Sequence, residues 1–180
     1  MIAEFMLHRT RAQQVLPVYL DFVKSYPDVE SLAVALPAEI KEVTKHLGLH
    51  WRAQHFLGAV EFVLNTFNGR YPDTEEELLR IPGVGEYIAR VILTVCFDKS
   101  APVVDSNIAR FINRFYNLNL AGEIRRKKKI LEKARILFEC NNPGQFLFAI
   151  VDFTFMICKP LNPLCDNCYL KGYCGYITEP

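Results

Sequence analysis

Apolar side chains recur at helical spacing through most of the chain. The first stripe, which contains Pro17 as an expected kink, comprises Val15, Val18, Tyr19, Phe22 and Val23. The second stripe, which follows Trp51, comprises Phe56, Leu57, Val60, Val63, Leu64 and Phe67. A period of three to four residues predicts amphipathic helices that bury these positions.

Turn residues separate these predicted helices. Pro27-Asp28 predicts a turn before a short helix over residues 31–36. Pro37 is expected in the first turn of a helix that runs to about His46, where the missing amide of proline is tolerated. Residues 47–50 predict another turn, and Asn68-Gly69 predicts a left-handed helix cap.

Residues 74–107 combine a short helix, a glycine-containing hairpin and the start of a further helix. Thr74 to Glu77 has capping-box spacing, and the sequence Pro82-Gly83-Val84-Gly85 then interrupts the helical pattern. Such a loop brings backbone close to a ligand, and the amides of a following helix suit an anion such as a DNA phosphate. A plain chain reversal is the alternative interpretation of the Pro-Gly turn.

The second half of the chain is also predicted to be helical. Residues 91–97 are rich in β-branched side chains, and their composition alone permits a strand. We predict a helix over residues 86–97, since Ile88, Val91, Ile92 and Val95 share one helical face. The same spacing predicts a helix that opens at Asp105-Ser106-Asn107 and a last helix that delivers Cys158. The predicted fold class is therefore all-α.

Composition and charge narrow the possible functions. The 180 residues, 51% of them hydrophobic, are enough for one large domain or two small ones that share an interface. With 21 basic and 20 acidic residues, nucleic acid has to be held by local contacts. The one dense basic run, residues 125–129, is usually a solvated helix face, with phosphate contact as the minority interpretation. No apolar run suggests a membrane span or a secretory signal, so we expect an intracellular protein.

Four cysteines lie near the C-terminus with six, two and five residues between them: Cys158, Cys165, Cys168 and Cys174. Zinc sites with four cysteines usually use two Cys-x2-Cys pairs, and only one is present here. A [4Fe-4S] cluster takes one thiolate at each iron and tolerates longer arms, so we favour the cluster and keep zinc as the alternative. Cys96 and Cys140 fall in apolar stretches and are expected to be buried.

Three motifs together resemble the helix-hairpin-helix DNA glycosylases that carry an iron-sulfur loop. These motifs are residues 79–89 around the hairpin, residues 103–110 (Val-Val-Asp-Ser-Asn-Ile-Ala-Arg) and the cysteine spacing. The resemblance runs from about Glu4 to Tyr176 and implies two helical subdomains with a DNA cleft between them. One subdomain would contain residues 1–10 and 111–180, with the cluster loop at 158–174. The other would contain residues 11–110, with the helix-hairpin-helix at 75–97.

The resemblance also implies roles for three side chains in catalysis. Asp105 matches the carboxylate that stabilises the cation left on the sugar when the base departs, although an N-cap role is its structural alternative. Family members that also cut the strand have a lysine at the position of Tyr87, and a phenol forms no Schiff base. Glu4 lies in a segment where adenine and thymine mismatch glycosylases place a glutamate that faces the flipped base.

Further positions are assigned to DNA by the same resemblance. Pro82, Gly83, Val84 and Gly85 would grip a backbone phosphate, and Leu49 or His50 would fill the gap left by the flipped base, unless residues 47–50 are an ordinary surface turn. The pair His8-Arg9 is closer to the thymine mismatch pattern than to the paired glutamines of the adenine branch, and we assign Arg9 to DNA binding.

The expected function is that of a monofunctional glycosylase that removes thymine or uracil opposite guanine. An adenine glycosylase acting on A·8-oxoguanine or A·G, a catalytically idle DNA-binding module and a redox or metal-binding protein are the alternatives. Adenine glycosylases continue into a further C-terminal domain, whereas this chain ends at Pro180. Relatives also have an N-terminal segment before the glutamate helix, so a truncated start is considered. The expected partner is double-stranded DNA, with no membrane, and the protein is expected to act as a monomer in the cytoplasm or nucleoid of a prokaryote.

Overall fold

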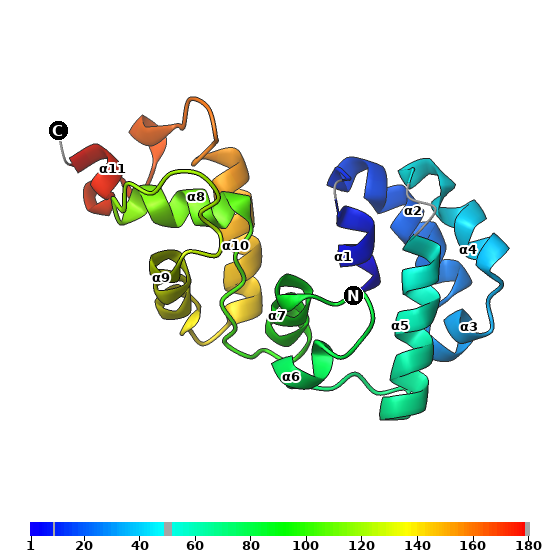
Figure 1. Ribbon diagram of the computed structural model, residues 1–180. Helices are drawn as coiled ribbons and strands as arrows, with labels where there is room; N and C mark the ends of the chain where they lie inside the picture. Colours follow the sequence, from blue (N-terminus) through cyan, green and yellow to red (C-terminus); the bar gives the residue numbers. More distant parts are fainter. Residues whose placement is uncertain (9, 49–51, 179–180) are drawn as a thin grey trace. The chain divides into compact units, whose positions relative to one another are not determined.

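The computed structural model describes residues 1–8, 10–48 and 52–178, and every regular element within them is a helix (Figure 1). The all-α prediction is confirmed. The chain divides into two compact units, Met1–Ala89 and Arg90–Pro180. No helix in the described ranges has both the length and the apolar character needed to cross a membrane.

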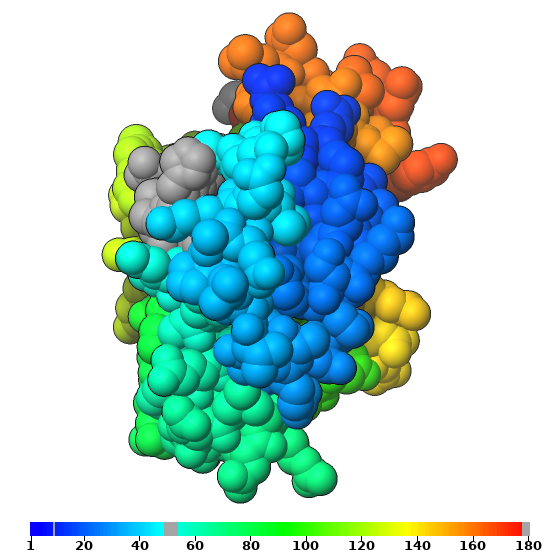
Figure 2. Space-filling model, turned by 90° about the vertical axis from the view of Figure 1, so that its right-hand side faces the viewer, coloured from blue at the N-terminus to red at the C-terminus, as the bar shows by residue number. Residues whose placement is uncertain are grey.

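Unit 1 is built around α5. Its helices are α1 (Ile2–Leu7), α2 (Ala12–Ser25), α3 (Val29–Ala33), α4 (Pro37–Thr44), the 3-10 turn η1 (Lys45–Leu47), α5 (Arg52–Phe67) and α6 (Glu75–Leu78). Helix α5 packs against α1, α3 and α4, while α2 and α4 lie side by side on one face of the unit (Figure 2). Phe56 of α5 is fully buried, stacked on Phe5 at 5.6 Å and edge-on to Phe22 at 5.8 Å between ring centroids. The predicted apolar stripes therefore form this core.

Most predicted helix ends in unit 1 agree with the structure. Pro37 lies in the first turn of α4, and Asn68 and Gly69 both have positive φ after α5, as a left-handed cap requires. The short helix α3 begins two residues earlier than predicted, because Asp28 and Ser31 form a reciprocal capping box. The Asp28 carboxylate accepts a hydrogen bond from the Ser31 amide at 2.7 Å.

Helix α7 (Glu86–Cys96) begins in unit 1 and continues into unit 2. Residues 91–96 are helical, so the helical interpretation of this β-branched run is confirmed. The other helices of unit 2 are α8 (Ser106–Phe115), α9 (Lys128–Phe138), α10 (Pro143–Met156), the 3-10 turns η2 (Cys165–Asn167) and η3 (Lys171–Tyr173), and α11 (Gly175–Thr178).

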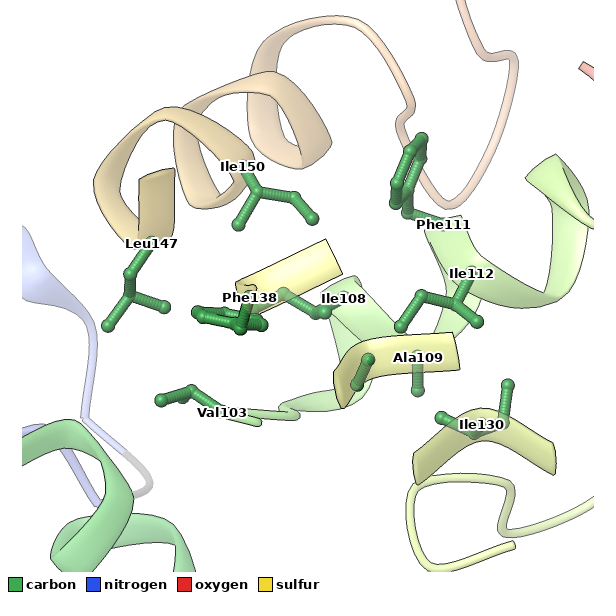
Figure 3. Close-up of a cluster of buried hydrophobic side chains, with 10 residues drawn as sticks. Val103, Ile108, Ala109, Phe111, Ile112, Ile130, Phe138, Leu147 and Ile150 are labelled. Atoms are coloured by element: carbon green, nitrogen blue, oxygen red, sulfur yellow. The ribbon is translucent and has the colours of Figure 1, made fainter. Parts of the chain in front are cut away.

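Helices α8, α9 and α10 enclose the core of unit 2. Phe138 of α9 lies among Ile108, Val103 and Leu147, and Ile130 lies near Ile112 (Figure 3). All six are buried, and each residue of this size contributes roughly 1.5–3 kcal/mol on burial. This packing fixes α8, the helix that opens at Asp105, against α9 and α10.

The prediction that Cys96 and Cys140 are buried is wrong, since both are exposed. Cys96 is the last residue of α7, and Cys140 follows the C-cap residue of α9, Glu139. The buried face of each helix ends before these positions, at Thr94 in α7 and at Phe138 in α9. Periodicity does not reveal where the last buried turn stops.

The predicted subdomains divide the chain differently from the two compact units, because one of them joins the N-terminal residues to the C-terminal part of the chain. Helix α1 packs against α2 and α5 within unit 1. The grouping of residues 1–10 with residues 111–180 depends on how the two units are placed, and it stays a prediction.

Candidate active site and cysteine pocket

The hairpin between α6 and α7 is fixed by its buried residues and exposes its glycines. The Thr74 hydroxyl caps α6 by accepting a hydrogen bond from the Glu77 amide at 3.4 Å. Ile81 and Val84 are buried, and the Val84 amide donates to the Ile81 carbonyl at 3.0 Å. Pro82, Gly83 and Gly85 remain on the surface. Val84 therefore anchors the loop, while its neighbours face solvent.

Two glycines of this hairpin have different surroundings. Gly83 has a φ of +80°, and a Cβ there would lie 3.2 Å from the His55 ring and 3.3 Å from the Phe5 ring. A Cβ on Gly85 would meet nothing within 4 Å. Neither glycine amide donates a hydrogen bond to the part of the chain that the structure describes. Both amides are thus without a partner in the described residues, and backbone donors left in this way are what an anion requires.

Asp105 is held in one orientation at the start of α8. One carboxylate oxygen accepts hydrogen bonds from the Asn107 and Ile108 amides at 2.8 and 2.7 Å, and the other accepts from the Asn107 side chain at 3.1 Å. Its N-cap role is confirmed. The carboxyl group is half-buried and is not enclosed. A fixed carboxylate that keeps partial access to solvent suits the stabilisation of a developing cation.

Arg110 links this carboxylate to the cysteine loop. Its guanidinium donates to the Asn107 side chain at 2.9 Å and to the Cys158 carbonyl at 2.9 and 3.3 Å. A further hydrogen bond reaches the Thr154 carbonyl at 3.1 Å. Burial lowers the pKa of Arg110, and the charges of Cys158 and Asp105 oppose that shift. A continuous path, Asp105 to Asn107 to Arg110 to Cys158, therefore lies within unit 2.

Arg114, one helical turn beyond Arg110, holds the cysteine loop itself. It donates to the Lys159 carbonyl at 2.6 Å and the Pro160 carbonyl at 2.9 Å, and it lies 3.7 Å from the Cys158 sulfur. Its guanidinium also stacks over the Tyr176 ring at 5.1 Å from the centroid. Since charge-assisted hydrogen bonds are roughly twice as strong as neutral ones, Arg114 fixes both ends of the loop on α8.

All four cysteines predicted as ligands line one pocket, of about 370 Å³ including its open mouth. Its other walls come from α8 and α10, chiefly Phe111, Phe115 and Phe153. Burial raises the pKa of Cys174, and the neighbouring thiols Cys158, Cys168 and Cys165 raise it further. Four soft donors in an apolar pocket fit a thiolate-bound metal group. As the side chains stand, no group of three or more His, Cys, Asp or Glu among residues 1–8, 10–48 and 52–178 is arranged to hold a single metal ion.

Comparison with known proteins decides the family. The sequence pattern of the "HhH-GPD superfamily base excision DNA repair protein" matches residues 2–139. The chain belongs to the HhH-GPD superfamily. The resemblance inferred from the hairpin, Asp105 and the cysteine spacing is thereby confirmed.

Several relatives of this HhH-GPD protein are named for their substrates. The thymine-DNA glycosylase of Aeropyrum pernix is 31% identical over 99% of this chain and 82% of its own length. The thymine/uracil-DNA glycosylase of Methanothermobacter thermautotrophicus is 30% identical over 99% of this chain and 81% of its own. The solved structure of a thermostable thymine-DNA glycosylase superposes with a TM-score of 0.90 at 30% identity, covering 98% of this chain and 82% of that one. The chain spans about half the length of the bacterial adenine DNA glycosylases that it also matches.

The remaining predicted site residues of this HhH-GPD protein lie in unit 1 or outside the described residues. Glu4 is half-buried in the first turn of α1, and Tyr87 is 40% exposed at the second position of α7. Arg9, Leu49 and His50 lie outside the described residues, so their assignment to DNA stays a prediction.

The sequence analysis missed the roles of Arg110 and Arg114. Both were visible as cations four residues apart on a predicted helix, which places them on one face. That spacing shows only that the two cations share a face, and their partners, the carbonyls of Cys158 and Pro160, lie more than 40 residues away in sequence.

We expect Arg110→Lys to slow base excision about tenfold and to lower the melting temperature by a few degrees, while duplex affinity stays unchanged. Lysine keeps the charge but lacks the planar fork that reaches Asn107, Thr154 and Cys158 together. Losing one or two charge-assisted hydrogen bonds costs about 2 kcal/mol, or roughly 4–8 °C in a chain of this length. Arg135→Lys, at an exposed position on α9, is the control, and equal effects in both variants would contradict this role.

The two hairpin glycines provide a matched pair of substitutions. Gly85→Ala should weaken DNA binding about tenfold without changing stability, because its Cβ enters the space beside the free amides. Gly83→Ala should destabilise unit 1 by about 1–2 kcal/mol, since alanine disfavours positive φ and its Cβ crowds Phe5. Thermal melts and fluorescence anisotropy with a labelled duplex separate the two effects. Unchanged duplex affinity in Gly85→Ala would argue against a phosphate at this loop.

Proposed function

We propose that this HhH-GPD protein is a monofunctional DNA glycosylase that hydrolyses the N-glycosidic bond of thymine or uracil opposite guanine after base flipping. The observation that carries the proposal is the Asp105 carboxylate, which three hydrogen bonds hold in one orientation at the start of α8. The choice of base is supported by its relatives, which are a thymine-DNA glycosylase and a thymine/uracil-DNA glycosylase.

Asp105 acts on the sugar. As the bond from the sugar to the base lengthens, positive charge develops on the sugar ring, and a carboxylate fixed in place stabilises that charge without reorganising. The same oxygen atoms orient or deprotonate the attacking water. Asn107 and Arg110 act through Asp105 as positioning residues, because the Asn107 side chain donates to the carboxylate and Arg110 in turn donates to Asn107.

The hairpin between α6 and α7 binds a backbone phosphate of the DNA strand. A phosphate accepts hydrogen bonds from the Gly83 and Gly85 amides while Pro82 lies beside it, and these contacts position the duplex without reading its sequence. Leu49 or His50 fills the gap left by the flipped nucleotide, and Arg9 contacts the DNA near Glu4. Glu4 donates a proton to the departing base or orients water.

The cysteine pocket holds a [4Fe-4S] cluster through Cys158, Cys165, Cys168 and Cys174. The support is a donor set of four thiols around one pocket. When bound, the cluster supplies four iron-thiolate bonds that cross-link the C-terminal loop. Arg110 and Arg114 of α8 donate hydrogen bonds to this loop, so that the cross-linked loop also stabilises α8. We further propose that the protein acts as a monomer in the cytoplasm, at the nucleoid.

Tyr87 makes the enzyme a glycosylase without lyase activity, since its phenol forms no imine with the sugar. Tyr87→Lys is therefore expected to create strand cleavage and an adduct with abasic DNA that borohydride traps. Tyr87→Gln is the control for loss of the phenol alone. Absence of a trapped adduct in the lysine variant, with base release retained, would place position 87 away from the sugar.

A panel of duplexes tests the proposed function. Free base is measured after single-turnover incubation with G·T, G·U, A·8-oxoguanine, A·G and an oxidised pyrimidine, with and without alkali. We expect thymine and uracil release opposite guanine, and strand breaks only after alkali. Release of adenine alone would replace the proposal by an adenine glycosylase, and no release from any duplex would leave only DNA binding.

A further inference from the structure

Five consecutive cations, Arg125 to Lys129, form the densest charge in a chain whose net charge is only +1. All five side chains are exposed, and together with α9 they belong to unit 2, the unit that carries Asp105. We call residues 125–129 the basic segment. Its place relative to Asp105 is fixed by the packing of α9 on α8, since Ile130 lies in the same core as Ile108 and Ile112 (Figure 3).

The protein neutralises only part of this segment. Arg125 forms a two-pronged ion pair with Glu123 at 2.7 and 2.9 Å, Lys127 donates to the Ala121 carbonyl at 2.9 Å, and Lys128 lies 3.8 Å from Glu132. Arg126 and Lys129 form no hydrogen bond or ion pair with the described residues. Two exposed cations are thus left available to an anion.

The position of the segment also opposes stability. Lys128 and Lys129 occupy the first turn of α9, and that turn contains no acidic residue. Lys127 is the N-cap residue, and its side chain makes no capping hydrogen bond to the helix. Cations at this end of a helix face the positive end of its dipole, where acidic residues are preferred. The arrangement therefore costs stability in the free protein, and a bound anion would offset that cost.

The segment and Asp105 belong to the same compact unit. The Asp105 carboxylate is one of the charges that raise the pKa of Arg125, after Glu123, so the two lie within electrostatic range. A nucleotide whose sugar meets Asp105 has a phosphate on each side, and each strand carries one phosphate per about 3.4 Å of helix axis. These flanking phosphates are the groups that exposed cations of unit 2 would contact.

We propose that Arg126 and Lys129 bind backbone phosphates of the DNA strand that carries the flipped nucleotide. This inference rests on the proposed function, because that function brings the strand to Asp105. It gives unit 2 a phosphate contact separate from the hairpin of unit 1. The contact depends on phosphate charge and not on base sequence, so it raises the affinity for matched and mismatched duplexes by the same factor.

The test compares two double variants with the same net charge. Arg126→Gln with Lys129→Gln removes the proposed contacts, and Lys24→Gln with Arg135→Gln removes two exposed cations near the C-terminal ends of α2 and α9. Binding of a labelled matched duplex is followed by anisotropy between about 50 and 200 mM NaCl. We expect the slope of log affinity against log salt to shrink by about 1.8 in the first variant and to stay near wild type in the second.

Thermal melting is a second readout, in which the variant that loses DNA affinity should gain stability. The first variant should melt about 1–3 °C higher than wild type, because it relieves repulsion at the helix start, and the second should melt no higher than wild type. Equal salt slopes in the two variants would overturn the proposal. Base release by the wild type is measured in parallel. A changed salt slope without base release would refute the glycosylase function and keep the phosphate contact. Base release with an unchanged salt slope would refute the phosphate contact and keep the glycosylase function.

Discussion

Asp105→Asn should reduce the rate of base release by on the order of 10³ while leaving duplex affinity within a few fold of wild type. Asparagine has nearly the same shape and is an equally good N-cap, so the hydrogen bonds from the Asn107 and Ile108 amides can persist. The substitution therefore removes the negative charge and keeps α8 intact. A large loss of rate at constant stability would separate the catalytic role of Asp105 from its structural role.

The measurement is single-turnover release of the base from a G·T duplex, with binding measured in parallel. Asp28→Asn is a matched control, because Asp28 is also an N-cap whose carboxylate accepts an amide hydrogen bond, from Ser31 at 2.7 Å. It lies in unit 1 and should change neither rate nor affinity. A rate for Asp105→Asn within tenfold of wild type would mean that another group stabilises the cation.

Cys168→Ser should abolish the broad absorbance near about 400 nm that marks a thiolate-bound iron-sulfur cluster, and it should lower the melting temperature by about 10 °C or more. Cys168 lines the cysteine pocket together with the other proposed ligands, and a serine hydroxyl is a harder and weaker donor than a thiolate. Loss of the cluster also frees the loop that Arg110 and Arg114 hold through the carbonyls of residues 158–160. We therefore expect slower base release together with the lost colour.

Cys140→Ser is the control for this prediction, because Cys140 is exposed and does not line the pocket. It should keep both absorbance and melting temperature. Iron and zinc are quantified on the purified wild type and on both variants. A colourless wild type with one zinc per chain would replace the cluster by the alternative ligand, and an unchanged spectrum in Cys168→Ser would remove that residue from the ligand set.

Local sequence signals predicted much of the fold. The helix over residues 86–97 was identified because Ile88, Val91, Ile92 and Val95 share a face, although their β-branching favours strands. The cap at Asn68-Gly69 and the proline at the start of α4 followed from backbone restrictions of single residues. These features depend on neighbours within a few residues, which a single sequence contains in full.

Features that depend on contacts distant in sequence were harder to predict. Arg110 meets Cys158 across 48 residues and Arg114 meets Pro160 across 46, and no local pattern specifies either pairing. The exposure of Cys96 and Cys140 likewise depends on where the core ends. The cysteine pocket could be predicted because four cysteines fall within one short loop, so that spacing limits their geometry directly.

The central claim is that the Asp105 carboxylate meets a positively charged sugar, and a cationic sugar mimic tests it most directly. Duplexes with a pyrrolidine abasic analogue, which is protonated, are compared with duplexes that carry the neutral tetrahydrofuran analogue opposite guanine. We predict that the wild type binds the cation about 10–100-fold more tightly and that Asp105→Asn loses this preference. Equal affinity of the wild type for both analogues, or a preference that survives in Asp105→Asn, would contradict the account.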